Sequence, residues 1–472
     1  MNETTMKRQP FATRNPDLRN RRVLVLGMGK SGLAAARLAA AHGARVTIAD
    51  RKPAERLGDA IERARRTGAQ VHPGGHPASL VDRADLVVVS PGVPGGVEPL
   101  VAARRAGVPV WSEIELAARF CRGRVVGITG SNGKSTVTAM TGAILRRAGV
   151  PGGTGGNLDV PFCDLLEHDA DNAVHAVELS SFQLEHVESF SPGVAAVLNL
   201  TPDHLDRYPD LDAYAAAKAR LLEVQQPGAA AILNADDGSA ERFRPAVRGR
   251  LYLFSVRRPV DQGAFVRDSR LVLRTAAGEE TLFARDELPL PGEHNVANAL
   301  AAALAARLVG CRLAAVAAAL RDYRALPHRL EHVGRVGGVE FYNDSKATNP
   351  DSTMRAIEAF EPGRVVLILG GRDKGADWDA LVDGLVARRV RVMLVGEAAA
   401  MLSTRLASRV PVIDCGTIPR AVERGFADAG PGDVVLLSPG CASFDQFDHF
   451  IARGDAFRQA VERLEPPEVP DA

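Results

Sequence analysis

The chain has 472 residues, of which 46% are hydrophobic and 24% are charged, and its formal net charge is +1. At about 150 residues per domain, this length and composition predict roughly three globular domains. Because a net charge near zero creates no field that would gather a polyanion, no nucleic-acid partner is expected.

The sequence also lacks the patterns of secreted and membrane proteins. It has no run of about 18 apolar residues and no apolar segment at its N-terminus, so we expect a cytoplasmic protein without membrane insertion. Its cysteines are odd in number and widely spaced, which suits neither a disulfide framework nor a zinc cluster. The cysteines expected to be reduced thiols are Cys121, Cys163, Cys311, Cys415 and Cys441.

Lysine is rare in this chain, since only seven of the 58 lysines and arginines are lysine. A chain that uses arginine by default should keep lysine mainly where a compact, rotatable or titratable amine is needed. The lysines that lie in or beside compact polar motifs, and so mark the candidate chemistry, are Lys30, Lys134, Lys218, Lys346 and Lys374.

Short β-branched runs alternate with alanine-rich helical stretches along the chain, which indicates βαβ units and parallel sheets. We predict three Rossmann-like α/β domains with mainly parallel sheets, at residues 1–112, 113–325 and 326–472. Strands are predicted at Val23–Leu26, near Val46, and at Leu86–Val89, Val125–Ile128, Val174–Val177, Val194–Leu198, Val339–Tyr342, Val365–Leu369, Val390–Val395 and Val434–Leu437. Helices are predicted at Ser31–Ala41 and Asn295–Leu308, and a β-rich stretch at Leu251–Leu273.

In the first domain, Gly27-Met-Gly-Lys-Ser-Gly32 follows the first strand and Asp50 ends the next, as in the Rossmann fingerprint. Glycines and a helix N-terminus recognise a pyrophosphate, so the pattern fits a nicotinamide dinucleotide, a uridine diphosphate or a plain α/β turn. Ser90-Pro-Gly92, at the end of another strand, either lines the same crevice or is turn chemistry alone.

The second domain opens with Gly127-Ile-Thr-Gly-Ser-Asn-Gly-Lys-Ser-Thr136, between an apolar strand and a helical run. Its glycines let backbone N–H groups close on phosphate, Lys134 reaches terminal phosphates, and Ser135 or Thr136 can bind Mg²⁺. Ile128 replaces the first glycine of the common P-loop, so only the GxxGK[ST] half matches. The pattern predicts a central P-loop-type ATPase domain.

Two polar motifs begin where later strands of this domain end, which is where an open α/β sheet binds ligands. Glu178 opens the first, and His204 lies in the second, Asn199-Leu-Thr-Pro-Asp-His-Leu-Asp-Arg-Tyr-Pro209. Carboxylate and imidazole groups suit Mg²⁺ or Mn²⁺, which need only one or two protein ligands. Lys218 follows on an alanine-rich helix, and its local sequence favours an exposed lysine.

The third domain places polar loops after three predicted strands, at Asn343–Asn349, Gly370–Lys374 and Ser438–Phe447. Their lysines and hydroxyls suit a dicarboxylate, because ammonium and hydroxyl donors form charge-assisted bonds with carboxylate oxygens. Each loop alone is also compatible with a helix cap, a role that Asp351 and Asp445 are expected to fill in part.

Between residues 20 and 460 the motifs follow one another as GxGxSG, TGSNGKST, GGN, ELSSFQLE, NLTPDHLDRYP, the AAK helix, PGEHNVANA, LPHRLE, NDSKATN, GGRDK and SPGCASFDQF. This series closely resembles the Mur ligases of peptidoglycan synthesis and, within that family, the enzymes that add D-glutamate. The resemblance implies that the first domain binds the UDP moiety of the substrate, the second ATP and Mg²⁺, and the third the incoming amino acid. The implied substrates are UDP-N-acetylmuramoyl-L-alanine and D-glutamate, and a monomer is expected.

By this resemblance the catalytic residues are Lys134, His204 and Lys218. The resemblance also implies that Lys218 is carbamylated and behaves as a carboxylate near Mg²⁺. This replaces the interpretation of Lys218 as an exposed lysine, which its local sequence favours. The expected metal ligands are Ser135, Glu178 and His204. The expected ATP contacts are Gly130, Asn132, Gly133, Lys134, Ser135, Thr136, Asn298, Arg329, Asp344 and Lys346. The expected contacts of the UDP-linked substrate are Gly29, Lys30, Ser31, Asp50, Arg51, Ser90, Asn157 and Ser181. The expected contacts of the amino acid are Thr348, Lys374, Ser443 and Phe450.

One loop departs from the family pattern. The family's GGNIG appears here as Gly155-Gly-Asn-Leu-Asp159, so Asp159 adds an anion near the expected substrate. The Asp-x-x-Arg type of recognition loop found in ligases for diamino acids has no counterpart near residues 438–450, which favours glutamate.

The expected reaction is ATP-dependent amide formation, in which ATP phosphorylates the alanyl carboxylate and the amine of D-glutamate then displaces phosphate. A nicotinamide-dependent dehydrogenase is an alternative, but it leaves the Lys134 loop and the third domain unexplained. A non-catalytic nucleotide-binding protein would need a broken catalytic set, whereas Lys134, Glu178, His204 and Lys218 are all present. A sister Mur or folylpolyglutamate-type ligase differs only in its amino acid or acceptor.

Overall fold

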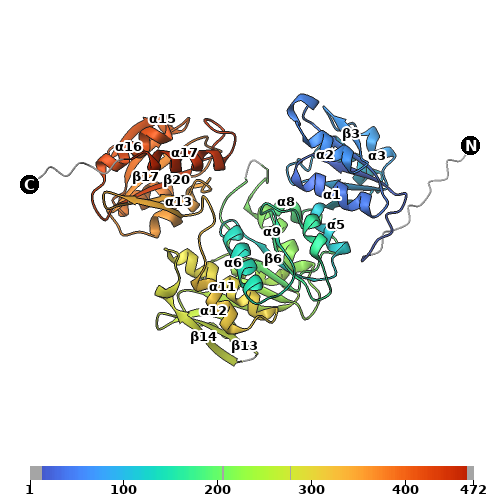
Figure 1. Ribbon diagram of the computed structural model, residues 1–472, viewed down its shortest axis with the longest axis horizontal. Coiled ribbons are helices and arrows are strands. Elements are labelled where there is room, and N and C mark those ends of the chain that lie inside the picture. Colours follow the sequence, from blue (N-terminus) through green and yellow to red (C-terminus); the bar gives the residue numbers. More distant parts are fainter. Residues whose placement is uncertain (1–12, 205–206, 277, 465–472) are drawn as a thin grey trace, which may run out of the picture. The chain divides into compact units, whose positions relative to one another are not determined.

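The computed structural model describes residues 13–204, 207–276 and 278–464. Its internal contacts divide the chain into two compact units (Figure 1). Unit 1 contains residues 1–285 and 299–320, and unit 2 contains residues 286–298 and 321–472. Unit 1 holds two β-sheets and unit 2 holds a third, and the domain boundaries at residues 112 and 325 stay predictions.

The first sheet of unit 1 is parallel, with the strand order β3-β2-β1-β4-β5. Its strands are β1 (Arg22–Leu26), β2 (Arg45–Asp50), β3 (Gln70–Pro73), β4 (Leu86–Val89) and β5 (Val110–Ser112), and its helices are α1 (Lys30–Ala41), α2 (Ala60–Arg66), α3 (Ser79–Asp82), α4 (Glu98–Arg105) and α5 (Glu113–Phe120). A Cβ on Gly32 would lie 1.9 Å from the Gly27 carbonyl oxygen. Only glycine permits this approach, so the glycine motif packs the start of α1 against the end of β1.

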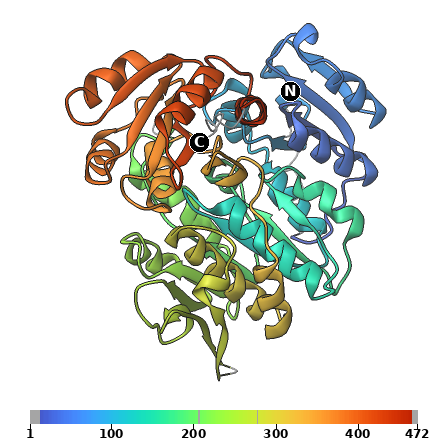
Figure 2. The ribbon, with the colours of Figure 1, turned by 60° about the vertical axis from the view of Figure 1, so that its left-hand side comes forward.

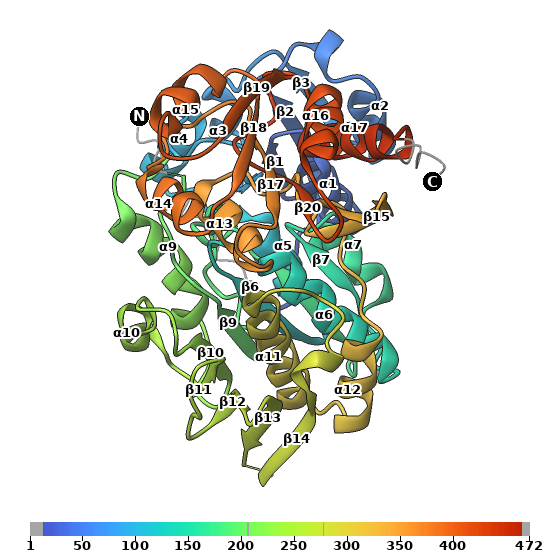
Figure 3. The same cartoon turned by 90° about the vertical axis from the view of Figure 1, so that its left-hand side faces the viewer.

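The second sheet of unit 1 has the strand order β14-β13-β12-β11-β10-β9-β6-β8-β7. Its strands are β6 (Arg124–Thr129), β7 (Thr154–Gly156), β8 (Val174–Glu178), β9 (Val194–Val197), β10 (Ala230–Asn234), β11 (Arg250–Ser255), β12 (Gly263–Arg267), β13 (Arg270–Thr275) and β14 (Gly278–Ala284). The helices of this part of the chain are α6 (Lys134–Arg147), α7 (Phe162–Leu165), α8 (Ser181–Leu184), α9 (Leu211–Glu223), α10 (Ala240–Phe243), α11 (Glu293–Leu308) and α12 (Leu313–Arg321). All strand pairs are parallel except β12 with β13 and β13 with β14, which form the antiparallel end of the sheet (Figure 3).

Unit 2 contains a six-stranded sheet of order β15-β16-β20-β17-β18-β19. Its strands are β15 (Glu331–Val336), β16 (Val339–Asn343), β17 (Val365–Gly370), β18 (Arg391–Val395), β19 (Val412–Gly416) and β20 (Val434–Gly440). Its helices are α13 (Pro350–Glu358), α14 (Asp379–Ala387), α15 (Ala399–Leu406), α16 (Ile418–Asp428) and α17 (Phe450–Glu462). Only the β15–β16 pair is antiparallel within the described residues.

Helices cover both faces of the sheet in unit 2 (Figure 2). One hydrophobic core joins the sheet to α13, α14 and α15, and a second joins its other face to α16 and α17. The central strands are buried on both faces, which explains why they read as uninterrupted apolar runs such as Val365–Leu369.

The predicted fold class is confirmed, because the structure has three α/β sheets with mainly parallel strands. Each predicted strand begins within one residue of the observed one. The strands that were not predicted are β3, β5, β7, β10, β14, β15 and β19. Two of them, Thr-Gly-Gly in β7 and Ala-Ala-Ile-Leu-Asn in β10, each contain only one of the β-branched residues that signal a strand.

Most of the polar motifs follow the carboxyl ends of strands. They come after β1 and β4 in the first sheet, after β6, β8 and β9 in the second, and after β16, β17 and β20 in the third. In a parallel sheet these ends share one edge, where open α/β folds bind ligands. Among the helices of the described ranges, none has the length and hydropathy that a membrane crossing requires.

Candidate active site

The phosphate-loop motif forms the turn between β6 and α6. Gly133, which precedes the first residue of α6, has a φ of 81°, a conformation that favours glycine. The Lys134 ammonium folds back over the loop and donates to the carbonyl oxygens of Gly130 (2.9 Å) and Ser131 (2.8 Å). The loop therefore presents backbone N–H groups, a helix N-terminus and an ammonium in one turn, which is the equipment of a phosphate site.

Asn199, which follows β9, holds the outer part of this loop. Its side-chain oxygen accepts from the Asn132 N–H at 2.8 Å, and its amide donates to the Asn132 carbonyl at 3.1 Å. Its backbone carbonyl accepts from the Ser131 N–H at 3.1 Å. No role was predicted for Asn199, although its position at a strand end, at the head of the motif that contains His204, is the signal that could have found it.

Glu178, the last residue of β8, brings two other predicted residues together. It is 3% exposed, and one carboxylate oxygen accepts from the Ser135 hydroxyl. The other oxygen accepts from the Asn157 amide at 3.0 Å. The expected metal ligands Ser135 and Glu178 thus lie together beside a predicted substrate contact, and hard oxygen donors of this kind suit Mg²⁺.

Lys218 lies in α9 and is 1% exposed, although its local sequence indicated an exposed lysine. Its Nζ donates to the carbonyl of Gly130 at 2.8 Å and lies 4.3 Å from the centroid of the Tyr214 ring. Burial, reinforced by the positive charge of Lys134, lowers the pKa of Lys218 well below its usual range. The amines of both lysines therefore converge on one carbonyl oxygen of the phosphate loop, and the buried one favours the neutral form.

His204 lies in the same cluster of side chains as Lys218. Its ring is 4.9 Å from that of Phe182 and 6.0 Å from that of Tyr214, measured between centroids. Its backbone has a φ of 57°, and its N–H donates to the carboxylate of Asp203 at 2.9 Å. Residues 205 and 206 of the same motif lie outside the described residues.

Arg207 connects this motif to the first sheet of unit 1. It donates to the Val93 carbonyl at 3.1 Å and to the carboxylate of Glu185 at 3.1 Å. Its guanidinium stacks over the Phe182 ring at 4.5 Å, and that ring in turn contacts His204. Sequence reasoning assigned no role to Arg207, which links the loop after β4 to the neighbourhood of His204.

Asp50 holds the glycine motif after β1. Its carboxylate accepts from the Met28 N–H at 2.7 Å and from the Lys52 N–H at 2.8 Å. Ser90, after β4, donates to the Gly27 carbonyl at 3.3 Å, so the two strand-end motifs are in contact. The structure thus brings Ser90 and the glycine motif together. The other predicted contacts of the UDP-linked substrate lie near the same strand ends or at the start of α8, namely Gly29, Ser31, Arg51 and Ser181.

The departure from the family pattern, Asp159, pairs with Lys30. Their charged atoms are 3.4 Å apart, and both side chains are largely exposed. Asp159 has a φ of 54°, in the left-handed region. Asp tolerates this region better than most residues but less well than the glycine of the family pattern.

In unit 2, the predicted nucleotide contact Asp344 follows β16 and has a shifted pKa. Its carboxyl oxygens accept from the Leu330 N–H (3.1 Å) and from the Ser438 hydroxyl (3.0 Å). Burial raises the pKa of Asp344 to about 7, against the opposing effect of these hydrogen bonds and of Arg329 and Arg453.

The remaining predicted residues of unit 2 lie on strand-end loops and on two helices. The Lys346 ammonium lies 3.8 Å from the centroid of the Phe450 ring, so a predicted nucleotide contact touches a predicted amino-acid contact. Asn298 donates to Asn295 at 3.3 Å within α11. Ser443 is 2% exposed, whereas Lys374 is exposed and Thr348 half-buried.

The expectation that Asp351 and Asp445 serve as caps is wrong. Asn349 caps α13 by accepting from the Ser352 N–H at 2.8 Å, because Pro350 occupies the first helical position. The cap of α17 is His449, and Asp445 instead accepts from the Glu397 N–H at 3.0 Å.

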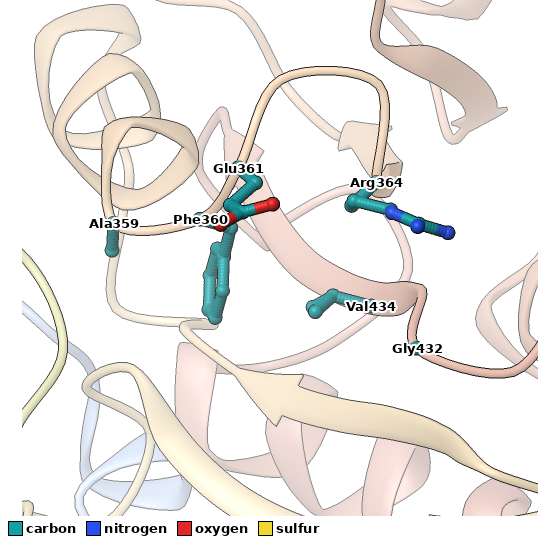
Figure 4. A pocket seen from close by; sticks show the side chains of 6 residues that line it. All are labelled: Ala359, Phe360, Glu361, Arg364, Gly432 and Val434. Atoms are coloured by element: carbon teal, nitrogen blue, oxygen red, sulfur yellow. The ribbon is translucent and has the colours of Figure 1, made fainter.

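Unit 2 also has a pocket of about 380 Å³ that lies away from these loops (Figure 4). It lies beside the amino ends of β17 and β20, whereas the polar loops follow their carboxyl ends. Its lining residues are Ala359, Phe360, Glu361, Arg364, Gly432 and Val434, none of which was predicted as a site residue.

A cluster of ligand-type side chains near the amino ends of β6 and β8 does not suit a metal. Cys121, Asp169 and His175 have ligand atoms within 4.8 Å of one another. His175 Nδ1 accepts from the Gly153 N–H at 3.1 Å, so Nε2 carries the proton and donates it to Asp169 at 2.9 Å. Burial raises the pKa of the Cys121 thiol to about 12, which disfavours the thiolate. The cluster is a hydrogen-bonded network in which the imidazole lone pair is already engaged by the Gly153 N–H.

Three family models match the chain in order. A model of the MurD-like N-terminal domain of Mur ligases matches residues 21–112, the Mur ligase middle domain matches residues 128–306, and the glutamate ligase domain of Mur ligases matches residues 328–441. Together they span most of both units.

Relatives of nearly the same length share close to half of their residues with this chain. The UDP-N-acetylmuramoylalanine--D-glutamate ligase of Acidobacterium capsulatum is 47% identical, over 94% of this chain and 97% of its own. The ligase of the same name from Solibacter usitatus is 45% identical, over 94% and 98%. That of Myxococcus xanthus is 44% identical, over 95% and 99%.

Solved structures with lower identity share the fold. A pseudomurein peptide ligase type C from Methanothermus fervidus superimposes with a TM-score of 0.59 at 20% identity, covering 94% of this chain and 100% of its own. The UDP-N-acetylmuramate-alanine ligase MurC from Thermotoga maritima gives 0.56 at 20% identity, covering 93% and 99%.

Proposed function

Because the chain belongs to the Mur ligase family, we propose that the residues grouped above carry out the reaction of its D-glutamate-adding members. The protein is an ATP-dependent, amide-forming ligase. It adds D-glutamate to UDP-N-acetylmuramoyl-L-alanine in the synthesis of peptidoglycan precursors. The alternatives of a nicotinamide-dependent dehydrogenase and of a non-catalytic protein are therefore set aside.

The convergence of Lys134, Lys218 and Glu178 at the phosphate loop carries the assignment of roles. Two amines donate to one loop carbonyl, and a carboxylate binds the hydroxyl that follows Lys134. The Lys134 ammonium can exchange neutral carbonyl oxygens for the more strongly charged phosphate oxygens of ATP. The other proposed ATP contacts are Gly130, Asn132, Gly133, Ser135 and Thr136 in unit 1 and Asn298, Arg329, Asp344 and Lys346 in unit 2.

The proposed ligands of Mg²⁺, or of Mn²⁺ in its place, are Ser135, Glu178 and His204. Hydroxyl, carboxylate and imidazole groups fit these ions, which usually keep several waters. A bound divalent cation neutralises charge on the phosphoryl group in transfer. The chain's own part is to fix the Glu178 carboxylate, through Ser135 and Asn157, at the end of β8.

We propose that Lys218 is carbamylated in the active protein. Burial favours the neutral form of its amine, and a neutral amine can attack carbon dioxide. One N–C bond forms as one C=O π bond of carbon dioxide breaks and its electron pair moves to oxygen. The nitrogen then releases one proton to solvent, and the product is a carbamate with a single negative charge. This converts a buried neutral amine at the phosphate loop into an anion, which suits a site that must hold a divalent cation near Glu178.

In the proposed reaction, the alanyl carboxylate attacks the γ-phosphorus of ATP, and ADP leaves. The amine of D-glutamate then attacks the acyl phosphate, and inorganic phosphate leaves from a tetrahedral intermediate as the amine loses a proton. The proposed contacts of the UDP-linked substrate are Gly29, Lys30, Ser31, Asp50, Arg51, Ser90, Asn157 and Ser181. D-Glutamate is assigned to Thr348, Lys374, Ser443 and Phe450, where ammonium and hydroxyl donors suit its two carboxylates.

Phosphate release tests this function directly. The purified protein is mixed with ATP, Mg²⁺ and UDP-N-acetylmuramoyl-L-alanine, and then with D-glutamate, L-glutamate or meso-diaminopimelate in separate reactions. Release that requires D-glutamate and stops when a chelator removes Mg²⁺ is the expected result. Release only with another amino acid would overturn the D-glutamate assignment, and silence with all three would move the search to other acceptors.

We also propose that the protein is a cytoplasmic monomer. All five cysteines are unpaired and buried, as suits a reducing compartment. Light scattering at the protein concentration of the assay should give the mass of one chain, and a mass of two chains would contradict this proposal.

A further inference from the structure

Arg453, in the first turns of α17, is a buried arginine whose hydrogen-bond acceptors are all uncharged. It is 2% exposed. Its Nη1 donates to the Cys441 carbonyl at 3.0 Å, its Nη2 to the Ser345 carbonyl at 2.8 Å, and its Nε to the Ser345 hydroxyl at 3.1 Å. Within the described ranges it forms no ion pair.

These contacts join the polar loops after β16 and β20. Ser345 lies between Asp344 and Lys346, and its hydroxyl also donates to the Phe450 carbonyl at 2.8 Å. Cys441 lies two residues before Ser443. One guanidinium therefore links the segments that carry proposed nucleotide contacts to those that carry proposed amino-acid contacts.

The loop after β17 rests against the same guanidinium. A Cβ on Gly371 would lie 3.1 Å from Arg453 Nη1 and 2.4 Å from the Ala442 carbonyl oxygen. The backbones of Arg372 and Ala442 also exchange hydrogen bonds at 2.8 and 3.0 Å. Lys374 thus belongs to a loop whose path is set beside Arg453.

Arginine is required for this geometry. Its planar fork presents donors in three directions, whereas the single nitrogen of lysine cannot reach two loops in the same way. Burial lowers the pKa of Arg453 to about 10, so the group stays charged at neutral pH. The nearby carboxylates of Asp344 and Asp445 raise this pKa without forming an ion pair with it.

We propose that Arg453 is the positioning residue for the incoming amino acid in unit 2, and that its charge favours the binding of a ligand with two carboxylates. It holds the three strand-end loops in one arrangement, while its unpaired charge adds positive potential to them. A buried charge without a counter-charge attracts an anion more strongly than a neutralised one does. The inference rests on the proposed function, since it takes Thr348, Lys374, Ser443 and Phe450 to be the contacts of D-glutamate.

The test compares Arg453→Met with Arg453→Lys, and uses Arg463→Met, at the exposed end of the same helix, as the matched control. Arg453→Met should raise the KM for D-glutamate by at least about tenfold, the effect of one lost hydrogen bond to a charged group. The KM for UDP-N-acetylmuramoyl-L-alanine should stay within about twofold, because its proposed contacts lie in unit 1. Arg453→Lys, which keeps the charge without the fork, should remain impaired toward D-glutamate.

Hydrogen exchange of the free protein supplies a readout that needs no substrate. Arg453→Met should speed exchange in the loops at residues 344–349, 371–374 and 441–447 and leave the strands of unit 2 protected. The control variant should leave exchange in these loops unchanged. Equal KM values and equal exchange in Arg453→Met and Arg463→Met would overturn the proposal. So would a fall in kcat with every KM unchanged, because that pattern indicates a general structural role.

Different results would contradict the D-glutamate assignment and the role of Arg453. If wild-type protein turns over with an amino acid other than D-glutamate, the proposed function fails, while the exchange result still tests how Arg453 holds the loops. If wild-type protein uses D-glutamate and Arg453→Met matches the control, only the role of Arg453 fails.

Discussion

Each of the two units buries a long basic side chain at a strand-end loop, and the two units use different residues for it. Lys218 in unit 1 donates to the Gly130 carbonyl, and Arg453 in unit 2 donates to the Ser345 and Cys441 carbonyls. Burial lowers the pKa of Lys218 well below its usual range but leaves that of Arg453 at about 10. Lysine is thus used where an amine can become neutral and react, and arginine where a fixed charge and a rigid fork are needed.

The largest effect is expected when Lys218 is replaced by a residue that cannot form a carbamate. Lys218→Ala should lower kcat at least about 10³-fold, corresponding to about 4 kcal/mol of activation free energy, because the proposed carbamate is lost. Lys218→Arg should be equally inactive, since a guanidinium that stays charged cannot form a carbamate. High bicarbonate or a small added carboxylate should partly restore the alanine variant but not the arginine variant. Lys52→Ala, in an exposed loop, is the control, and full activity of Lys218→Ala would contradict the carbamate.

The next largest effect is on the stability of unit 2 and comes from the Asp344 carboxyl. The pKa of Asp344 is raised from 3.8 to about 7, so the folded state binds a proton more tightly than the unfolded state does. This contribution is complete below about pH 4 and is lost as the pH rises to about 7. Asp344→Asn should therefore flatten the loss of stability across this range, by about 1.4 kcal/mol for each unit of pKa shift at most.

The chain's two tryptophans make that measurement specific to unit 2. In a Trp111→Phe background, Trp378, which is 1% exposed in the core of unit 2, reports urea unfolding by its fluorescence. Asp448→Asn, at an exposed site of the same unit, is the control. Parallel pH dependence in the Asp344→Asn and Asp448→Asn variants would show that Asp344 is not the titrating group.

The exposed lysine Lys30 should give the smallest effect, because solvent screens its pairing with Asp159. An exposed ion pair is worth below about 1 kcal/mol, so Asp159→Gly should lower the KM for UDP-N-acetylmuramoyl-L-alanine by about fivefold at most. The difference should shrink at high salt. Asp159→Asn, which tolerates the same backbone conformation, separates the charge from the strain at this residue. An unchanged or higher KM in both variants would show that Asp159 does not compete with the substrate for Lys30.

The sequence predicted the fold well where strands are apolar and central. Leu86–Val89 and Val365–Leu369 are buried at every position and were located correctly. The strand β7 is defined by its pairing with β8 and not by its own residues, so no local pattern could reveal it. The helix caps of unit 2 were also predicted wrongly. Proline is favoured at the first position of a helix, so Pro350 places the cap of α13 at Asn349 and not at the acidic Asp351.

The burial of Lys218 and Arg453 could have been predicted from the pattern of their helices. Lys218 has Tyr214 four residues before it and Leu222 four residues after it, and all three are buried on one face of α9. Arg453 precedes Phe457 and Ala460 on the buried face of α17 in the same way. A long cation in the apolar stripe of a helix was therefore the available signal for both residues. Their hydrogen-bond partners were not predictable, because most of them are backbone carbonyls of loops distant in sequence.

The five unpaired cysteines have a consequence for measuring motion between the units. Burial raises the pKa of Cys121, Cys163, Cys311, Cys415 and Cys441, so their thiols should react slowly with maleimide dyes. A single cysteine introduced on the surface of each unit should then take up nearly all of the label. Energy transfer between two such dyes would follow the distance between the units as ATP, UDP-N-acetylmuramoyl-L-alanine and D-glutamate are added in turn.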